Sequence, residues 1–274
     1  MPFEGFTSDG FLFGFALAVA SLGLYVRADA QESNMDQPRP IDSLSDEDWR
    51  ETPPSRREPI FNLPAVVVVL IAICVGIHAV RMLILSEPQD IGAIARFAFI
   101  PIRYSGQYVI DAYAWAGPVT YAFLHGGIAH LAVNMVWLAA FGSPLAHRIG
   151  AARFVAFWIF TALAAVGLHY ALHSGDPTPV VGASGAISGM MGAAARFAFQ
   201  IDRFAGKPAF TGPILPVGMV LRHRMTFMFL LVWFVINLAM GLGSVAPGVG
   251  QIAWEAHIGG LIAGFFGLAL FDRR

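Results

Sequence analysis

Apolar residues gather in long stretches along this chain, and shorter polar segments separate them. A helix needs about 20 predominantly apolar residues to cross a bilayer core of roughly 30 Å. Six stretches reach or nearly reach that length, at 62–85, 118–141, 151–172, 184–201, 226–243 and 252–271. The pattern therefore predicts an all-α, polytopic membrane protein whose core is a bundle of six helices.

Composition supports a membrane as the solvent. Of the 274 residues, 57% are hydrophobic and only 13% are charged, and the mean hydropathy is +0.64, which is too apolar for a water-soluble domain of this size. The net charge is −1 and no strongly basic patch stands out along the sequence, so nothing points to nucleic acid as a partner. The single cysteine, Cys74, cannot form an internal disulfide.

The N-terminal quarter differs from the rest of the chain. A shorter apolar stretch at 11–26 is followed by a segment rich in charge and proline at 27–58, which cannot build a core and should be disordered. We therefore expect an extra N-terminal transmembrane segment within 1–34, a cytoplasmic linker at 35–59 and a six-helix domain at 60–274.

Two other interpretations of the N-terminal stretch are open. The A-x-A pattern at 28–30 is typical of a signal-peptide cleavage site, but Glu4 and Asp9 stand where a signal peptide carries positive charge. Met35 could also be the true start, which would make 1–34 an artefact of an upstream start.

Arginine distribution predicts how the bundle is oriented. Lys and Arg gather after the second core stretch, in the loop before the fifth and at the chain end, as Arg148, Arg153, Arg203, Lys207, Arg222, Arg224, Arg273 and Arg274. The alternate loops, 173–183 and 244–251, carry neither residue type. By the positive-inside rule these two loops should face away from the cytoplasm. The mixed aromatic segment 87–117 is too polar to span and should lie at the interface.

The fourth core stretch opens with GASGAISGMMG at 182–192. Gly185, Gly189 and Gly192 repeat at helical spacing, which is typical of a small-residue packing seam. We expect Gly182, Gly185 and Gly189 to be helix-packing glycines. On this segment alone, Ser184 would most simply bond its own backbone. The catalytic alternative is that the glycines let a substrate backbone approach its Oγ at a helix N-terminus, where free N–H groups can hold an oxyanion.

The sixth stretch carries a histidine on a similar glycine face. His257 is followed by Gly260, Gly264 and Gly267 in AHIGGLIAGFFG. If this helix packs through its glycines on the helix of Ser184, serine and histidine lie at similar depth. A serine bonded to a buried imidazole is the smallest unit of an activated nucleophile.

The second stretch contributes HGGIAHLAVNMVW, in which His130 and Asn134 are four residues apart and share a helix face. Each alone would more simply be a structural hydrogen-bonding group, but beside a serine and a histidine both could donate to a developing negative charge. His125 should be interfacial. Glu255 should point to a different face from His257, which leaves a Ser-His dyad without a carboxylate.

Three motifs, in this order along the chain, resemble those of the rhomboid intramembrane serine proteases. They are HxxxN in the second stretch, GASG at the start of the fourth and AHIGG in the sixth, and together they are far more specific than any one alone. The resemblance covers 60–272. It implies that Ser184 is the nucleophile, that His257 is the general base, and that His130, Asn134 and the Ser184 backbone N–H form the oxyanion hole.

The resemblance also implies a function and its setting. It predicts a serine endopeptidase that cuts single-span transmembrane proteins within membrane lipid, with no cofactor, no metal and no nucleic acid, in a bacterial inner membrane. The alternative is an inactive rhomboid-like protein that binds membrane proteins or takes part in their quality control. Such a protein would lack the dyad, whereas Ser184 and His257 are both present.

Two positions depart from the family pattern. Many members carry a tyrosine four residues after the serine, stacked on the catalytic histidine, where this chain has Ser188. An acidic residue often precedes the basic-x-Gly turn after the second span, where this chain has Ala146. These changes leave open how the histidine is held and how that turn is braced.

Overall fold

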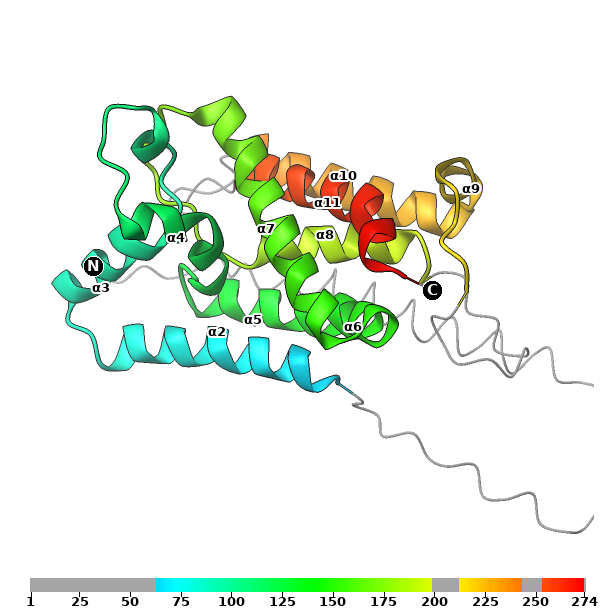
Figure 1. Cartoon of the computed structure of the whole chain (residues 1–274), viewed down its shortest axis with the longest axis horizontal. Coiled ribbons are helices and arrows are strands. Elements are labelled where there is room, and N and C mark those ends of the chain that lie inside the picture. Colours follow the sequence, from blue (N-terminus) through cyan, green and yellow to red (C-terminus); the bar gives the residue numbers. More distant parts are fainter. Residues whose placement is uncertain (1–62, 199–211, 243–252, 274) are drawn as a thin grey trace, which may run out of the picture. The chain divides into compact units, whose positions relative to one another are not determined.

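The computed structural model of the chain describes residues 63–198, 212–242 and 253–273 (Figure 1). The predicted N-terminal span and the linker, 1–34 and 35–59, lie outside the described residues. The described part is built from helices, as the apolar pattern predicts.

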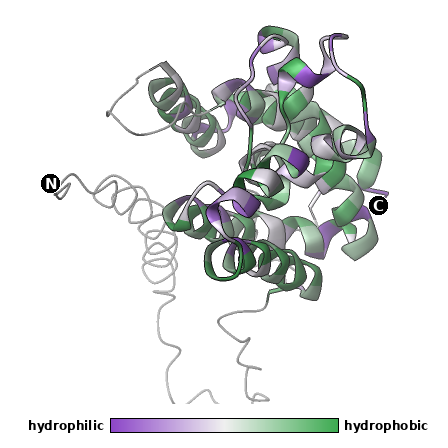
Figure 2. Cartoon of the chain, turned by 90° about the vertical axis from the view of Figure 1, so that its left-hand side faces the viewer, coloured by the Kyte–Doolittle hydropathy of each residue, from purple (hydrophilic) through white to green (hydrophobic). Residues whose placement is uncertain are grey.

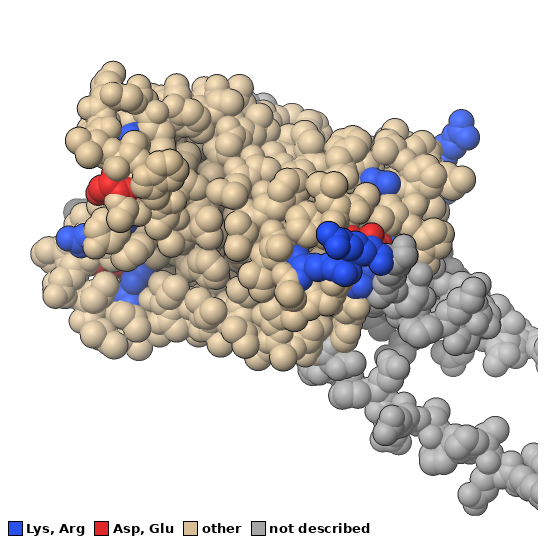
Figure 3. Space-filling view, viewed as in Figure 1, with Lys and Arg blue, Asp and Glu red and all other residues tan. Residues whose placement is uncertain are grey.

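Five stretches of helix in the described part are long and apolar enough to cross a membrane. They are α2 (Ala65–Leu83), the joined helices spanning Ile128–Ile149, α7 (Ala151–His173), α10 (Arg224–Leu242), which follows the short α9 (Val217–Arg222), and α11 (Trp254–Phe271). Most of the helical ribbon in Figure 2 has the colour of hydrophobic residues. On the face drawn in Figure 3, charged side chains gather at the two ends, with an uncharged band between them. The all-α, multi-pass prediction is confirmed.

The fourth expected span is shorter than predicted. Instead of running over 184–201, α8 (Ser184–Ala195) has 12 residues, about 18 Å of helix, which is too short to cross the bilayer core. Every residue from Gly185 to Ala195 is buried. A helix surrounded by protein has no lipid-facing backbone, so membrane thickness does not set its length. Arg196, the C-cap residue, donates to the carbonyl oxygens of Leu215 and Phe265.

The second expected span begins later than the predicted 118–141. Residues before it form α4 (Ala112–Thr120) and the 3-10 turn η3 (Tyr121–Phe123), and the membrane helix starts only after the Gly126-Gly127 pair, with α5 (Ile128–Trp137). Two adjacent glycines disfavour helix, and they separate two segments that form one apolar run in the sequence.

The same span then continues past its predicted end. A π-helical turn, η4 (Leu138–Gly142), joins α5 to α6 (Ser143–Ile149). Pro144 near the start of α6 has no N–H to donate to the preceding turn, which explains the change of helical register. The Ser143 hydroxyl donates to the carbonyl oxygen of Ala139 at 2.6 Å.

The aromatic segment before α4 holds two further short elements. They are α3 (Glu87–Phe97) and the 3-10 turn η2 (Pro101–Tyr104). The Gln89 side chain accepts from the N–H of Ser86 at the start of α3, which satisfies one free donor. Since α3 buries none of its residues and is amphipathic, it suits the interface that its sequence predicts.

The centre of the bundle is a glycine seam between α8 and α11. A methyl group on Gly260 would collide with the carbonyl of Gly185, and one on Gly264 with the carbonyl of Gly189. The other side of α8 lies on α7, since a methyl group on Gly185 would come within 2.7 Å of Ala165 Cβ. Small residues thus let three helix backbones approach closely, as in other membrane helix pairs. The largest fully buried side chains pack around this centre: Trp158, Tyr121, Phe154, Phe157, Phe197, Leu138, Leu145 and Met190.

A buried ion pair braces the turn between α6 and α7, where Ala146 replaces the family's acidic residue. The Arg148 guanidinium binds the Asp272 carboxylate, with Nε to Oδ2 at 2.8 Å, and also donates to the Gly212 carbonyl oxygen. Both side chains of the ion pair are buried. The partner acid therefore comes from the end of α11.

Candidate active site

Ser184 is the first residue of α8, and the chain before it is held in a tight turn. Gly182 has φ +126°, a conformation that only glycine adopts readily, and its N–H donates to the carbonyl oxygen of Tyr121 at 3.0 Å. Gly182 therefore lies in the turn that leads into α8. The sequence predicted it to be a helix-packing glycine, but it lies outside the packing seam. As the first residue of the helix, Ser184 has a backbone N–H with no intrahelical acceptor.

The glycine seam brings a histidine directly onto this serine. His257 projects from the second turn of α11, and its Nε2 lies 2.8 Å from Ser184 Oγ. Gly185, the residue after Ser184, and Gly260, one turn beyond His257, make the backbone contact that sets this spacing. The two residues that the sequence singled out are thus in hydrogen-bonding contact, as an activated nucleophile requires.

A third side chain, which sequence reasoning missed, holds the other side of the imidazole. Asn237 on α10 accepts with Oδ1 from His257 Nδ1 at 2.6 Å, and its Nδ2 donates to the Trp254 carbonyl oxygen at 3.1 Å. Because the amide oxygen can only accept, it fixes the proton of the neutral ring on Nδ1 and leaves Nε2 free to accept from Ser184. A lone buried amide in an apolar span was the signal that could have identified Asn237.

Asn237 also holds the imidazole in place of the tyrosine that many rhomboid proteases carry at the position of Ser188. Ser188 is buried on α8, and within the described part of the chain no aromatic ring stacks on His257. The imidazole is oriented from its Nδ1 edge instead, by a hydrogen bond from a neighbouring helix.

His130 lies beside the serine, close to Gly182. A methyl group added to Gly182 would come within 2.8 Å of His130 Nε2 and 3.6 Å of Ser184 Oγ, so ring and hydroxyl border the same small space. The Gly126 N–H points to His130 Nδ1 at 3.5 Å. With Nδ1 as acceptor, the neutral ring carries its proton on Nε2, which faces that space.

Asn134 is held one turn further along the same helix. It is buried, and its Nδ2 donates to the His130 carbonyl oxygen at 3.0 Å. An amide nitrogen has two hydrogens, so one is used within α5 and the other remains for a second acceptor. The structure places Asn134 on the helix of His130 without a direct contact to Ser184 or His257.

His125, which the sequence analysis expected at the membrane interface, is fully buried inside the protein. Its ring packs edge-on against that of His130, with 5.3 Å between centroids, and the Arg81 guanidinium donates to its carbonyl oxygen at 2.7 Å. Burial, together with the neighbouring His130, lowers the pKa of His125 to about 4. The ring is therefore neutral at physiological pH.

Glu255, two residues before His257, faces away from the serine. Its carboxylate lies 2.8 Å from His173 Nε2 and 3.6 Å from His169 Nδ1, both on α7. No carboxylate touches His257 within the described residues. Among the described residues, His169, His173 and Glu255 also form a group of side chains that lie close enough together to bind a metal ion.

Comparisons with known proteins find similarity to rhomboid proteins. A family model described as the Rhomboid domain matches residues 113–273. The chain is 31% identical over 155 residues to rhomboid protease GluP of Bacillus subtilis (strain 168), a match that covers 57% of this chain and 26% of that protein. It is 28% identical over 145 residues to RHOMBOID-like protein 5 of Arabidopsis thaliana, covering 53% of this chain and 40% of that one. The matched segment therefore spans less than half the length of either relative.

Proposed function

Because the chain belongs to the rhomboid family, we propose that it is an intramembrane serine endopeptidase that hydrolyses peptide bonds in or near transmembrane helices. The observation that carries this proposal is the 2.8 Å contact between Ser184 Oγ and His257 Nε2 at the start of a buried helix. A serine and an imidazole at this distance are the minimum needed for covalent acyl transfer.

In the proposed reaction, His257 Nε2 takes the hydroxyl proton while Ser184 Oγ attacks the scissile carbonyl carbon. The tetrahedral intermediate collapses when His257 returns that proton to the leaving amine, which departs and leaves an acyl-enzyme. A water molecule then gives a proton to His257 and attacks the ester carbonyl. The acid product is released and the serine regains its proton.

Asn237 would act as a positioning residue. When His257 accepts a proton on Nε2 it becomes a cation, and the Asn237 oxygen 2.6 Å from Nδ1 stabilises the N–H that faces it. A neutral amide stabilises that cation less than a carboxylate would. It also avoids placing a negative charge in the membrane-embedded bundle, where ionised groups are costly.

The oxyanion would be held by the Ser184 backbone N–H, His130 and Asn134. The His130 ring already borders the space beside Ser184, and its proton on Nε2 is available to donate. Asn134 would contribute its remaining N–H. Donors fixed before the reaction stabilise developing charge without reorganisation, and each is worth about 10²–10³ in turnover.

The substrates we propose are single-span membrane proteins whose helix unwinds locally. Helical backbone carbonyls are hydrogen-bonded and inaccessible, so cleavage requires an extended segment at the site. Ser184 and Trp254, the first residues of α8 and α11, lie at corresponding ends of the seam. We propose that the protein lies in a bacterial inner membrane. From the arginine distribution, we propose that this end of the seam faces away from the cytoplasm. Cysteines at Asp176 and Arg222, each in a Cys74→Ser background, test this: only the first should react with an impermeant maleimide from outside.

The decisive experiment labels the nucleophile. In purified protein, a fluorophosphonate probe should label wild type but neither Ser184→Ala nor His257→Ala. Ser188→Ala is the matched control, since it makes the same change one turn along α8 at a buried serine, and it should label normally. Cleavage of a panel of single-span substrates in liposomes should follow the same order. Equal labelling of Ser184→Ala would refute the assignment, whereas a correctly folded wild type that neither labels nor cleaves would favour the inactive relative.

A further inference from the structure

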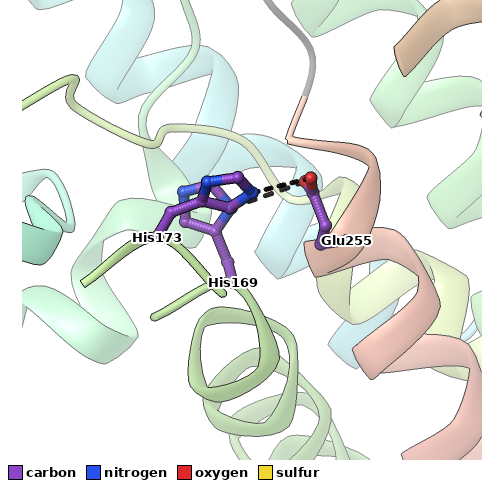
Figure 4. A group of neighbouring side chains, drawn as sticks. All are labelled: His169, His173 and Glu255. Carbon is purple, nitrogen blue, oxygen red and sulfur yellow. Dashed lines mark hydrogen bonds and ion pairs between the residues drawn. The ribbon is translucent and has the colours of Figure 1, made fainter. Parts of the chain in front are cut away.

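A second cluster of polar side chains lies at the end of α7, on a different face of α11 from the serine. His169 and His173 are four residues apart on α7, and Glu255 reaches them from the first turn of α11 (Figure 4). Their nearest ligand-type atoms all lie within 4.8 Å of one another. The two imidazoles are also neighbours, with ring centroids 5.0 Å apart.

Burial makes this cluster more than a surface ion pair. The side chains of His169 and Glu255 are 7% and 9% exposed, whereas that of His173 is 42% exposed. Among the described residues, Nδ1 of His169 has no hydrogen-bond partner, although it points toward Glu255. Buried polar atoms without partners are rare, and a bound ion is one of the few arrangements that satisfies such an atom.

We propose that His169, His173 and Glu255 form a binding site for a divalent transition-metal ion of the Zn²⁺ type. Two imidazoles and one carboxylate are a common protein ligand set for zinc, with a water molecule in the fourth position. The ligand atoms are His169 Nδ1, His173 Nε2 and a Glu255 oxygen, and the ion occupies the side that the unpartnered nitrogen faces.

The spacing of the cluster suits this assignment. Tetrahedral zinc with bonds of about 2.0–2.2 Å places its ligand atoms roughly 3.3–3.6 Å apart. The Glu255 oxygens now lie 2.8 Å from His173 Nε2 and 3.6 Å from His169 Nδ1. Because the three ligand atoms now lie within 4.8 Å of one another, admitting the ion requires the His173 ring to shift, and its exposure allows that movement. The same exposure gives the ion a path of entry.

Such an ion would join α7 to α11 through side chains, in addition to the glycine seam that joins α8 to α11 through backbone. Glu255 is two residues before His257, so the ion would fix the first turn of the helix that carries the proposed base. The site shares no residue with the Ser184–His257 pair, and metal binding at the cluster does not require the proposed protease activity.

The test is direct metal binding by the full chain, purified without a polyhistidine tag and stripped with a chelator. Zn²⁺ is titrated in competition with a chromogenic chelator, and Co²⁺ is added separately to record the visible d–d spectrum of a tetrahedral site. Wild type should take up one equivalent and show that spectrum. His169→Ala and His173→Gln should bind at least about 10-fold more weakly, since even loss of an outer-shell partner costs 10- to 100-fold.

Three variants distinguish metal binding at this cluster from loss of a hydrogen bond and from metal binding elsewhere on the chain. Glutamine at 173 keeps an N–H donor for Glu255, so loss of metal by His173→Gln is not a loss of the hydrogen bond. His147→Ala, at the far end of the bundle on α6, and Ser184→Ala should both bind like wild type. Zn²⁺ should raise the melting temperature of these two, but not that of His173→Gln. Unchanged binding by His173→Gln, loss of binding in Ser184→Ala, or no uptake by wild type would each overturn the proposal.

Discussion

Helices α10 and α11 are similar in length and in apolar composition, yet the bundle uses them in opposite ways. Within their membrane-spanning windows, 44% of α11 is buried but only 11% of α10. The difference follows from glycine: α11 carries a glycine face that meets backbone carbonyls of α8, whereas α10 presents large apolar side chains outward. Small residues, more than hydropathy, decide which helix lies in the centre.

The two helices also contribute differently to the site. His257 on α11 is fixed against Ser184 by backbone contact, while Asn237 on α10 reaches the same imidazole through one side chain. Ser184 and His257 are therefore held together by closely packed backbone, and the imidazole is oriented by a side chain from a helix that is mostly exposed on the bundle surface. Substitutions in α11 should therefore reduce stability and cleavage more than substitutions in α10.

Breaking the seam should have the largest effect. Leucine at Gly264 would have to displace the Gly189 carbonyl, an overpacking at or above the upper end of the usual range of about 1–3 kcal/mol. We expect Gly264→Leu to abolish both folded protein and cleavage. Thermal unfolding in detergent measures the first, and a cleavage assay in liposomes measures the second. Gly167→Leu is the control, because Gly167 is an exposed glycine in α7 with no atoms within 4 Å of an added Cβ. If Gly264→Leu melts like Gly167→Leu, the seam does not hold the bundle.

Removing an oxyanion donor should leave the fold intact but slow the reaction. His130→Ala should lower turnover by about 10²- to 10³-fold, equivalent to roughly 2.7–4 kcal/mol of barrier, with little change in substrate affinity. Steady-state cleavage in liposomes measures this.

Asn134→Ala tests the weaker of the two side-chain donors, because its amide already bonds the His130 carbonyl oxygen. It too should leave weak but measurable cleavage. A merely structural hydrogen bond between membrane helices is worth about 0.6 kcal/mol on average. Full activity in a destabilised Asn134→Ala protein would therefore remove Asn134 from the oxyanion hole.

Loss of the contact from α10 should be milder. Asn237→Ala should reduce cleavage about 10- to 100-fold, by analogy with loss of the group that orients a metal-binding histidine, and should change the melting temperature little. Asn237→Asp keeps an acceptor facing His257 Nδ1 and should restore part of the rate. An Asn237→Ala protein with full activity but a lowered melting temperature would make Asn237 a packing residue only.

The smallest effect concerns His125 and pH. The pKa of His125 is about 4 in the folded chain, below its ordinary value of 6.5. The His125 ring therefore binds a proton more readily in the unfolded chain. The contribution of this ring to stability is complete above pH 6.5 and is lost as pH falls toward 4. From pH 7.5 to 6 the loss should be about 0.8 kcal/mol. His125→Gln should flatten this part of the stability–pH curve, and an unchanged slope would contradict the prediction.

Most of the core could be predicted from the sequence because it is encoded by local patterns. Apolar stretches predicted the helices, and glycines at helical spacing predicted which faces meet, which placed Ser184 beside His257. The start of the second span was wrong because the residues before Gly126 are as apolar as a true span. Asn237 was missed because periodicity does not say which helix lies next to α11.

The ion pair between Arg148 and Asp272 joins residues 124 positions apart, and His257 lies 73 residues after Ser184. During synthesis, the turn after α6 and the nucleophile therefore emerge well before their partners on α11. At about 5–20 residues per second, Ser184 waits roughly 4–15 s for His257 to be synthesised. The Ser184–His257 contact can thus form only after the last described helix has been synthesised, so the order of translation would delay the proposed activity until the bundle has closed around the site.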